Sequence, residues 1–283
     1  MKLNVIHTGN FKLDGGAMFG VVPKALWSRT NPADENNLCS WAMRCLLVEI
    51  DDRKILIDNG IGNKQSEKFF SHYHLHGNQS LVSSLQNIGV SPDDITDVFL
   101  THLHFDHCGG GVIKTKEGDL ELLFKNAIYW TNSEHWKWAT EPNARERASF
   151  LKENILPMKD SGQLRFFDEA NEEFCTGFSV KYFHGHTHNQ MVPVLTYGEH
   201  TILFMADVLP STGHIPLPYV MGYDTQPLLT LAEKKAILEE AADNNYVLFL
   251  EHDYYNECCR VERGPKGVQL KETFSLSELS SAL

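Results

Sequence analysis

The stretch that most restricts how this chain can fold runs from residue 98 to residue 110 and reads VFLTHLHFDHCGG. Its apolar start is typical of a buried β-strand, and four potential metal ligands follow it: His102, His104, Asp106 and His107. Because alternate residues of an extended segment point the same way, His102 and His104 can converge on one ion. Asp106 and His107 follow in the turn and can face a second ion. A histidine-rich surface loop is the less favoured alternative.

Three later segments have the same form, an apolar strand that ends at a potential ligand. These strands run into the histidines around His186, into Asp207 and into His252. A charge buried at the end of an apolar strand costs free energy unless something pairs with it, and a metal ion would. Imidazole together with carboxylate favours Zn, Fe, Mn or Co over Ca or Mg. The sequence therefore predicts a transition-metal site built from several strand ends.

Short apolar runs typical of strands alternate with helical patterns along the whole chain, which indicates a layered α/β or α+β protein. We expect a single domain over residues 1–283, with an apolar loop at about residues 10–40. A helix start is expected at 91–94. We expect strands at 4–7, 45–50, 54–57, 98–101, 179–183, 201–206 and 246–251, and helices at 79–88, 143–156 and 230–244.

Net charge narrows the classes of partner. The chain carries a formal charge of −12, and an acidic surface argues against non-specific binding to nucleic acid or to anionic lipid. No basic start followed by an apolar run marks a signal peptide, and no stretch reaches the length of a membrane span. The six cysteines then indicate reduced thiols in the cytoplasm. We expect a small-molecule substrate and leave a homodimer open.

Together these motifs resemble the metallo-β-lactamase superfamily. HLHFDH at 102–107 is similar to its HxHxDH signature, and GHT at 185–187 to its second ligand motif. Asp207 resembles the family's bridging aspartate, and His252 its last histidine ligand. ILIDNG at 55–60 resembles an early turn of the family. The resemblance implies a four-layer αβ/βα sandwich.

The resemblance also implies two divalent transition-metal ions, with zinc preferred and iron, manganese or cobalt as alternatives. Asp58 would support the site by a hydrogen bond to a ligand or to the backbone. His184 and His188 are interpreted as neighbours. The implied ligands are His102, His104 and His186 for one ion, Asp106, His107 and His252 for the other, and Asp207 as the bridge.

Such a site predicts hydrolysis by a hydroxide shared between the ions, with Asp106 carrying a proton to the leaving group. Redox chemistry is disfavoured because His104 stands where flavodiiron proteins have glutamate. His72, His74 and His76 match no motif of the family, so we interpret them as solvated or structural.

Residues 14–24 and the run Met221–Asp224 resemble the branch that contains quorum-quenching N-acyl-homoserine lactonases of the YtnP type and methyl parathion hydrolases. Lactone opening is therefore the first expectation. Organophosphate triester hydrolysis and a glyoxalase II-like thioesterase are the alternatives, and a non-catalytic binding protein is disfavoured because no ligand is missing. The family's substrate tyrosine is replaced by Pro210, so Tyr223 is the candidate catalytic tyrosine, with Tyr219 and His214 as alternatives.

Large apolar side chains gather in the N-terminal loop, and two interpretations stay open for them. They either extend the core or line a groove for the acyl chain of the substrate. The residues are Met18, Phe19, Val21, Val22 and Trp27.

Overall fold

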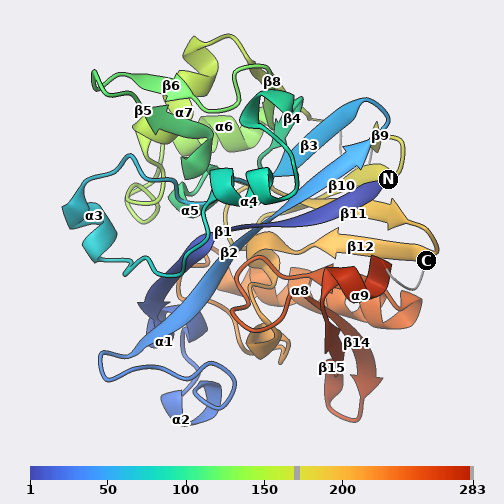
Figure 1. Ribbon diagram of the computed structural model, residues 1–283. Helices are drawn as coiled ribbons and strands as arrows, with labels where there is room; N and C mark the ends of the chain where they lie inside the picture. Colours follow the sequence, from blue (N-terminus) through green and yellow to red (C-terminus); the bar gives the residue numbers. More distant parts are fainter. Residues whose placement is uncertain (169–172, 281–283) are drawn as a thin grey trace. The chain divides into compact units, whose positions relative to one another are not determined.

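The structure is a computed structural model that describes residues 1–168 and 173–280. Figure 1 shows the arrangement of its helices and strands. The chain divides into two compact units. The first unit comprises Met1–Gly9 and Met43–Glu169, and the second comprises Asn10–Ala42 and Ala170–Leu283. The expectation of a single domain stays a prediction. No helix in the described ranges is long and apolar enough to cross a membrane.

The first unit is built on a six-stranded sheet in the order β1-β2-β3-β4-β7-β8. β2 and β3 form an antiparallel hairpin, whereas β3, β4, β7 and β8 run parallel. β1 and β2 also contribute residues to the second unit. The strands are β1 (Lys2–Asp14), β2 (Leu38–Ile50), β3 (Arg53–Ile57), β4 (Asp97–Phe99), β7 (Ile128–Thr131) and β8 (Leu164–Phe166).

Helices and short strands connect these parallel strands, as parallel pairing requires. The connecting elements are α3 (Glu67–Ser71), α4 (Leu81–Asn87), a 3₁₀ turn at Pro92–Asp94, α5 (Phe105–Cys108), a 3₁₀ turn at Gly109–Gly111, β5 (Val112–Lys114), β6 (Leu120–Leu122), α6 (Ser133–Thr140) and α7 (Lys152–Asp160). Every residue of β4 is buried, and Val98 lies in an apolar core with Leu56 and Tyr129. The carboxyl ends of parallel strands meet at one edge of a sheet, so Asp58 after β3 and His102 after β4 lie there together.

The second unit is built on a seven-stranded sheet in the order β15-β14-β13-β12-β11-β10-β9. Its neighbours are antiparallel except β12 and β13, which are parallel and joined by the long helix α8. The strands are β9 (Glu173–Cys175), β10 (Phe178–Phe183), β11 (Gln190–Tyr197), β12 (His200–Phe204), β13 (Val247–Phe249), β14 (Cys258–Gly264) and β15 (Gly267–Phe274). The helical elements are α1 (Gly15–Phe19), α2 (Lys24–Trp27), 3₁₀ turns at Ala206–Val208 and Thr212–His214, α8 (Pro227–Asn244) and α9 (Leu276–Ser280).

The residues at the two ends of helix α8 explain where the helix begins and ends. Pro227 occupies the first helical turn, where its missing N–H costs nothing, and Asn245 ends the helix in the left-handed conformation with φ 54°. Ile237, Leu238 and Ala241 are buried against the seven-stranded sheet's core residues. This packing fixes the connection between β12 and β13, and Asp207 and His252 lie three residues beyond the ends of these two strands.

Two expectations about helices were wrong. The helix expected at 143–156 is α7, which begins at Lys152 and runs through Pro157 to Asp160. Burial of Ile155 and Met158 outweighs the one backbone hydrogen bond that the proline removes. The start signal at 91–94 produces only the 3₁₀ turn at Pro92–Asp94, because strand β4 begins shortly after it.

The N-terminal segment also has more regular secondary structure than the expected loop. It contains the end of β1, the short helices α1 and α2, and the beginning of β2. Asp14 caps α1 by accepting a hydrogen bond of 2.8 Å from the Ala17 backbone N–H.

Candidate metal centre

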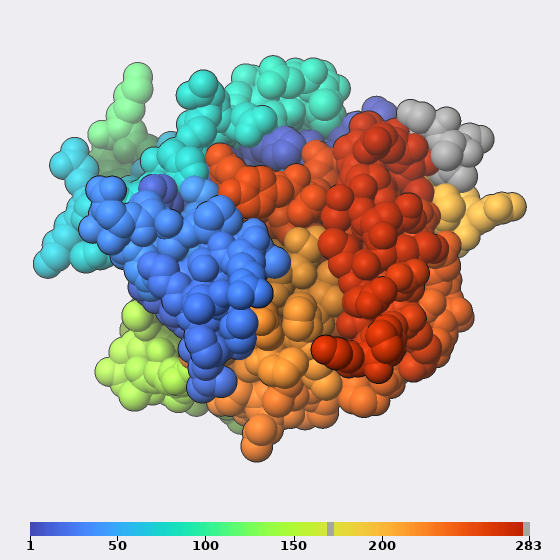
Figure 2. Space-filling model, turned by 90° about the horizontal axis from the view of Figure 1, so that it is seen from below, coloured from blue at the N-terminus to red at the C-terminus, as the bar shows by residue number. Residues whose placement is uncertain are grey.

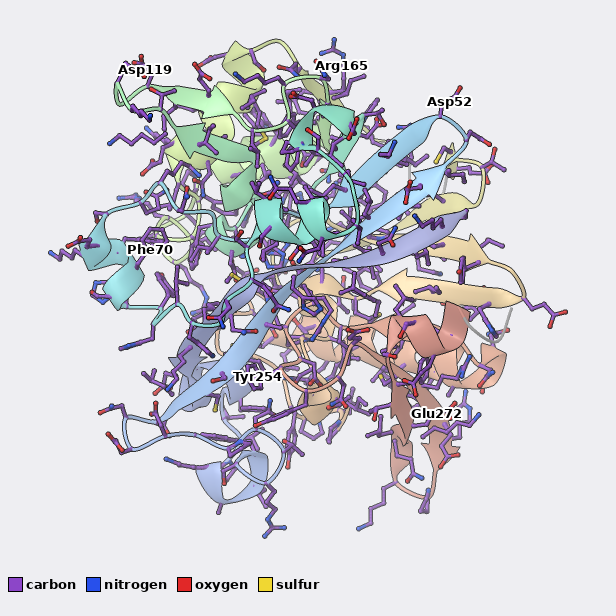
Figure 3. All side chains as sticks on the ribbon, viewed as in Figure 1. Asp52, Phe70, Asp119, Arg165, Tyr254 and Glu272 are labelled. Atoms are coloured by element: carbon purple, nitrogen blue, oxygen red, sulfur yellow. The ribbon has the colours of Figure 1, made fainter. Side chains whose placement is uncertain are left out.

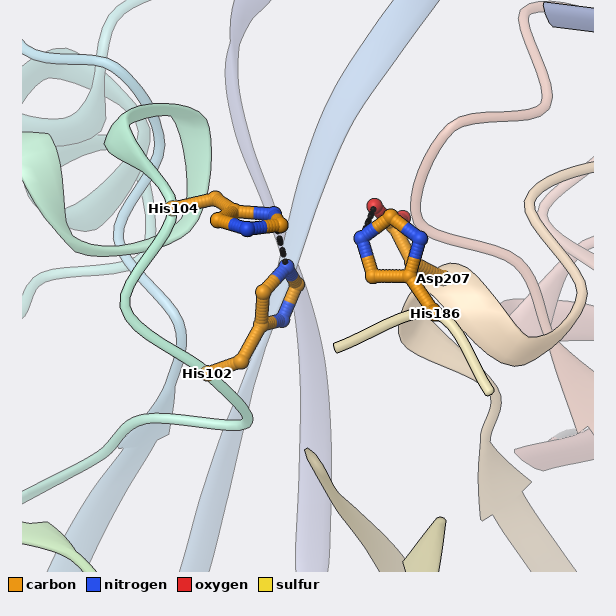
Figure 4. Close-up of side chains that lie close together, drawn as sticks. All are labelled: His102, His104, His186 and Asp207. Carbon is orange, nitrogen blue, oxygen red and sulfur yellow. Dashed lines mark hydrogen bonds and ion pairs between the residues drawn. The ribbon is translucent and has the colours of Figure 1, made fainter. Parts of the chain in front are cut away.

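The first unit brings three histidines of the motif together just beyond β4. His102 and His104 lie on the extended segment after the strand, and Nε2 of His102 is 3.1 Å from Nδ1 of His104, as Figure 4 shows. Helix α5 begins at the next residue and turns His107 back, so that its ring centroid lies 3.9 Å from that of His102. All three side chains are buried. The predicted convergence of His102 and His104 is thus present within the first unit.

Each of these imidazoles has one ring nitrogen in contact with an outer partner from the first unit. Such outer partners are the usual support of metal-binding histidines, because they fix the tautomer and the ring orientation. The contacts are Thr101 Oγ1 to His102 Nδ1 at 3.1 Å, Glu146 Oε1 to His104 Nε2 at 3.4 Å, and Asp58 Oδ2 to His107 Nδ1 at 3.0 Å.

Asp58 makes hydrogen bonds both to a ligand candidate and to the backbone. Besides His107, its carboxylate accepts hydrogen bonds from the backbone N–H of Thr101 at 2.8 Å and from the Thr101 hydroxyl at 2.6 Å. These bonds tie the end of β3 to the segment that carries His102. Asp58 itself adopts a positive φ of 55°, a conformation that aspartate tolerates better than most residues.

Two further residues of this unit support the cluster and were not predicted from the sequence. Glu146 is buried, and it accepts hydrogen bonds from Trp138 Nε1 at 2.7 Å and from Asn143 Nδ2 at 2.6 Å. Nε2 of His135, in α6, accepts the backbone N–H of Leu103 at 2.9 Å. Glu146 and His135 reach the cluster only when the 132–150 segment has folded. No local sequence motif therefore marks either residue.

The two glycines after the motif are required by close backbone approach. A Cβ on Gly109 would lie 2.2 Å from the carbonyl oxygen of Ile61, and one on Gly110 would lie 2.1 Å from that of Asn59. No side chain fits at either distance. Cys108, just before them, is buried and donates to the Leu103 carbonyl, and burial raises the pKa of its thiol to about 12. Cys108 is therefore a packing residue.

The second unit places one carboxylate between two histidines. Oδ2 of Asp207 lies 3.0 Å from Nε2 of His186, and Figure 4 draws this pair. Oδ1 of Asp207 lies 3.0 Å from Nε2 of His252. A carboxylate that presents its two oxygens to two different imidazoles has the geometry needed to bridge two cations.

The outer nitrogens of these histidines are also held. Nδ1 of His186 lies 3.0 Å from Oδ1 of Asp224, and Nδ1 of His252 lies 2.8 Å from the carbonyl oxygen of Ala42. Burial opposes protonation of His186, but the carboxylates of Asp207 and Asp224 outweigh it and raise the pKa of His186 to about 10. This position therefore attracts positive charge, which a proton or a metal ion can supply. The donors of both units fit transition metals in their chemistry and in their support.

The candidate substrate residues lie in different surroundings. His214 is buried, with Nε2 at 2.9 Å from the Met18 carbonyl oxygen and Nδ1 at 2.8 Å from the Ser211 hydroxyl. Burial lowers the pKa of His214 to about 3, so it is neutral and holds the α1 segment. Tyr219 lines a small cavity with Asp207. The side chain of Tyr223 is 42% exposed.

Comparison with known proteins identifies the class. The family model described as the metallo-beta-lactamase superfamily matches residues 44–252, and the chain belongs to that superfamily. The family and the mixed α/β fold expected from the motifs are thereby confirmed.

Individual proteins and solved structures are similar to this chain over most of its length. The N-acyl homoserine lactonase AiiA of Bacillus thuringiensis subsp. kurstaki is 26% identical over 274 residues, which cover 92% of this chain and 96% of the relative. A probable metal-dependent hydrolase from Staphylococcus aureus has a similar structure, with a TM-score of 0.86, 28% identity, and coverage of 97% of this chain and 98% of that one. AidC, a dizinc quorum-quenching lactonase solved with a product, shares the fold at a TM-score of 0.79 and 21% identity, over 96% and 95% of the two chains.

Proposed function

We propose that the chain holds two divalent metal ions, with zinc as the first choice. The family match supports this, because residues 44–252 include all the ligand candidates of the motifs. The single observation that carries the proposal is the placement of Asp207 between His186 and His252. The proposed ligands are those implied by the motifs: His102, His104 and His186 for one ion, Asp106, His107 and His252 for the other, and Asp207 as the bridge.

The proposed reaction is the opening of N-acyl-homoserine lactones or similar lactones. Relatives that match 92% and 81% of this chain carry the name N-acyl homoserine lactonase, which supports this substrate class over triesters and thioesters. When bound, the two ions would polarise the carbonyl under attack and lower the pKa of the attacking water. The protein's own residues would then orient the substrate and move the proton.

Asp106 is the proposed proton carrier. It lies at the first turn of α5 and is largely buried, with Oδ2 at 3.9 Å from Nε2 of His107. A carboxylate in that place can receive a proton during attack and pass it to the leaving alkoxide as the ring opens. Tyr223 is the proposed group that holds the substrate carbonyl, and Tyr219 is the alternative because it lines a cavity with Asp207.

The test is a substrate panel on protein whose metal content has been quantified. We expect kcat/KM for N-acyl-homoserine lactones to exceed that for aryl phosphotriesters and glutathione thioesters by at least about tenfold, a difference of 1.4 kcal/mol in transition-state binding. Triesters or thioesters as the best substrates would contradict the lactonase assignment while leaving the metal site intact. The separate variants Tyr223→Phe and Tyr219→Phe identify the tyrosine, because only the substitution that removes the hydroxyl holding the carbonyl should lower kcat/KM.

A further inference from the structure

A groove of about 720 Å³ lies in the second unit, and none of the proposed metal ligands lines it. Its walls come from α2, from the segment 212–219, from α8 and from the beginning of β15. In Figure 2, the segment that holds α2 (blue) and the β14–β15 hairpin (red) stand on either side of a lower orange surface. The volume falls within the range of about 300–1,000 Å³ that is usual for small-molecule sites.

The walls of this groove are mainly apolar and accessible. Leu26, Leu217 and Leu270 all line it, and these residues are 42%, 37% and 42% exposed, respectively. One apolar ligand can cover several leucines that share a concave surface and remove water from all of them. Single exposed leucines elsewhere on the surface offer no such site. An alkyl chain is therefore the chemistry that the walls favour.

Basic side chains also line the groove, in a chain whose net charge is −12. They are Arg29, Lys235 and Lys266, and the groove has one acidic residue, Glu239. Glu239 already pairs with Lys235 at 2.7 Å. Within residues 1–168 and 173–280, Arg29 and Lys266 form no ion pair, so both can receive an anionic group.

The adjoining hairpin does not neutralise these two cations. On β14, Arg260 forms an ion pair of 3.0 Å with Glu272, which Figure 3 labels on β15. Arg263 forms an ion pair of 2.5 Å with Asp243 of α8. Of the acidic side chains of the hairpin, Glu272 is engaged by Arg260 and Glu262 accepts a hydrogen bond of 2.8 Å from Gln269, so in the described ranges neither forms an ion pair with Arg29 or Lys266.

We propose that this groove binds single-chain amphipathic carboxylates, with the alkyl chain along the leucines and the carboxylate at Arg29 and Lys266. The ring-opened product of the proposed lactonase reaction belongs to this class. The groove nevertheless needs no metal and no lactone ring, so the inference goes beyond the proposed function and does not depend on it.

The probe is N-decanoylglycine, a ten-carbon acyl chain with a carboxylate and no ring to open, titrated calorimetrically below its micelle concentration. We expect one saturable site per chain. Shortening the chain to N-butanoylglycine weakens binding at least about tenfold, because six methylenes no longer cover the leucines. Replacing the carboxylate by the neutral amide weakens it about fivefold, since two exposed charge contacts are lost.

Variants locate the site. Arg29→Gln with Lys266→Gln should weaken N-decanoylglycine about fivefold, whereas the matched double change of Lys68→Gln with Lys116→Gln, which removes two exposed charges from the first unit, should leave it unchanged. Leu217→Ser should weaken binding of the same probe.

Leu228→Ser is the apolar control. This α8 leucine is 81% exposed and does not line the groove, so its removal should have no effect on the titration. Circular dichroism checks that every variant is folded.

Three results would overturn the proposal. The first is no saturable binding of N-decanoylglycine. The second is binding that Asp207→Asn abolishes and the groove variants leave intact, which would place the ligand at the metal centre. The third is a dimer that the groove variants dissociate in sedimentation while ligand binding is unchanged, which would make the groove an interface between two copies. Lactone hydrolysis is measured separately, so its failure is distinguishable from failure of the groove.

Discussion

Replacing Phe19 by alanine tests whether the N-terminal segment is core or substrate wall. The Phe19 ring is fully buried and stacks on Trp27 with centroids 5.3 Å apart and on His214 with centroids 4.3 Å apart. Removing a buried phenyl group loses its transfer free energy and leaves a cavity, which costs about 3–5 kcal/mol in a well-packed site. The flanking rings are held by other contacts, such as the bond from His214 to Met18, so the cavity cannot collapse easily.

The measurement is urea unfolding of the metal-loaded protein, followed by tryptophan fluorescence because Trp27 and Trp41 are buried near the changed site. We expect the free energy of unfolding to fall by about 3–5 kcal/mol and Tm to fall by roughly 6 °C or more. Val21→Ala is the matched control from the same segment. Val21 is 93% exposed, so its truncation should change stability by less than about 0.5 kcal/mol.

Kinetics on lactones of increasing acyl length separate the two interpretations. If Phe19 is core, Phe19→Ala lowers stability and leaves the ratio of rates on long and short lactones unchanged. The reasoning is refuted if the substitution costs less than about 1 kcal/mol and selectively lowers kcat/KM for long acyl chains, because a core phenyl group cannot be removed so cheaply. Phe19 would then be a wall of the acyl site.

Three further outcomes follow from the site and from one ion pair. Elemental analysis should find close to two transition-metal ions per chain, and Asp207→Ala should lower the occupancy; a fully loaded wild-type chain with one ion would contradict the dinuclear site. Asp106→Asn, where metal is retained, should lose more activity on alkyl lactones than on activated aryl esters, and equal losses would reduce its role to metal binding. Burial opposes ionisation of Asp97, but hydrogen bonds from Arg53, at 2.6 and 3.0 Å, from Thr96 and from Trp130 lower its pKa overall. A carboxyl whose folded pKa is lowered stabilises the fold above its unfolded pKa of about 3.9 and loses that contribution as pH falls through the folded value. Arg53→Met should therefore move the midpoint of acid unfolding to higher pH, and an unchanged midpoint would show that the pair adds nothing.

Strands and helices were predictable where a local pattern and its burial agree. The expected strands at 45–50 and 54–57 lie within β2 and β3, and the expected helix at 230–244 lies within α8. β11 was missed because Pro193 interrupts an otherwise apolar run, although its partner in the ladder is Val180 of β10. β15 was missed because most of its side chains are exposed, which leaves no alternating apolar pattern to recognise.

The ligand candidates were predictable for a different reason from their supports. A ligand candidate such as His102 lies in a contiguous motif after a strand, so a few adjacent residues of the sequence identify it. Its neighbour His104 is held by Glu146, which is 42 residues away, and His252 is held by the backbone carbonyl of Ala42, 210 residues away. Every residue has a backbone carbonyl, so the residue type at position 42 gives no sign of this contact. A single glutamate such as Glu146 forms no recognisable motif. The orientation of the imidazoles, and with it which ring nitrogen can receive a metal, is therefore a property of the folded chain.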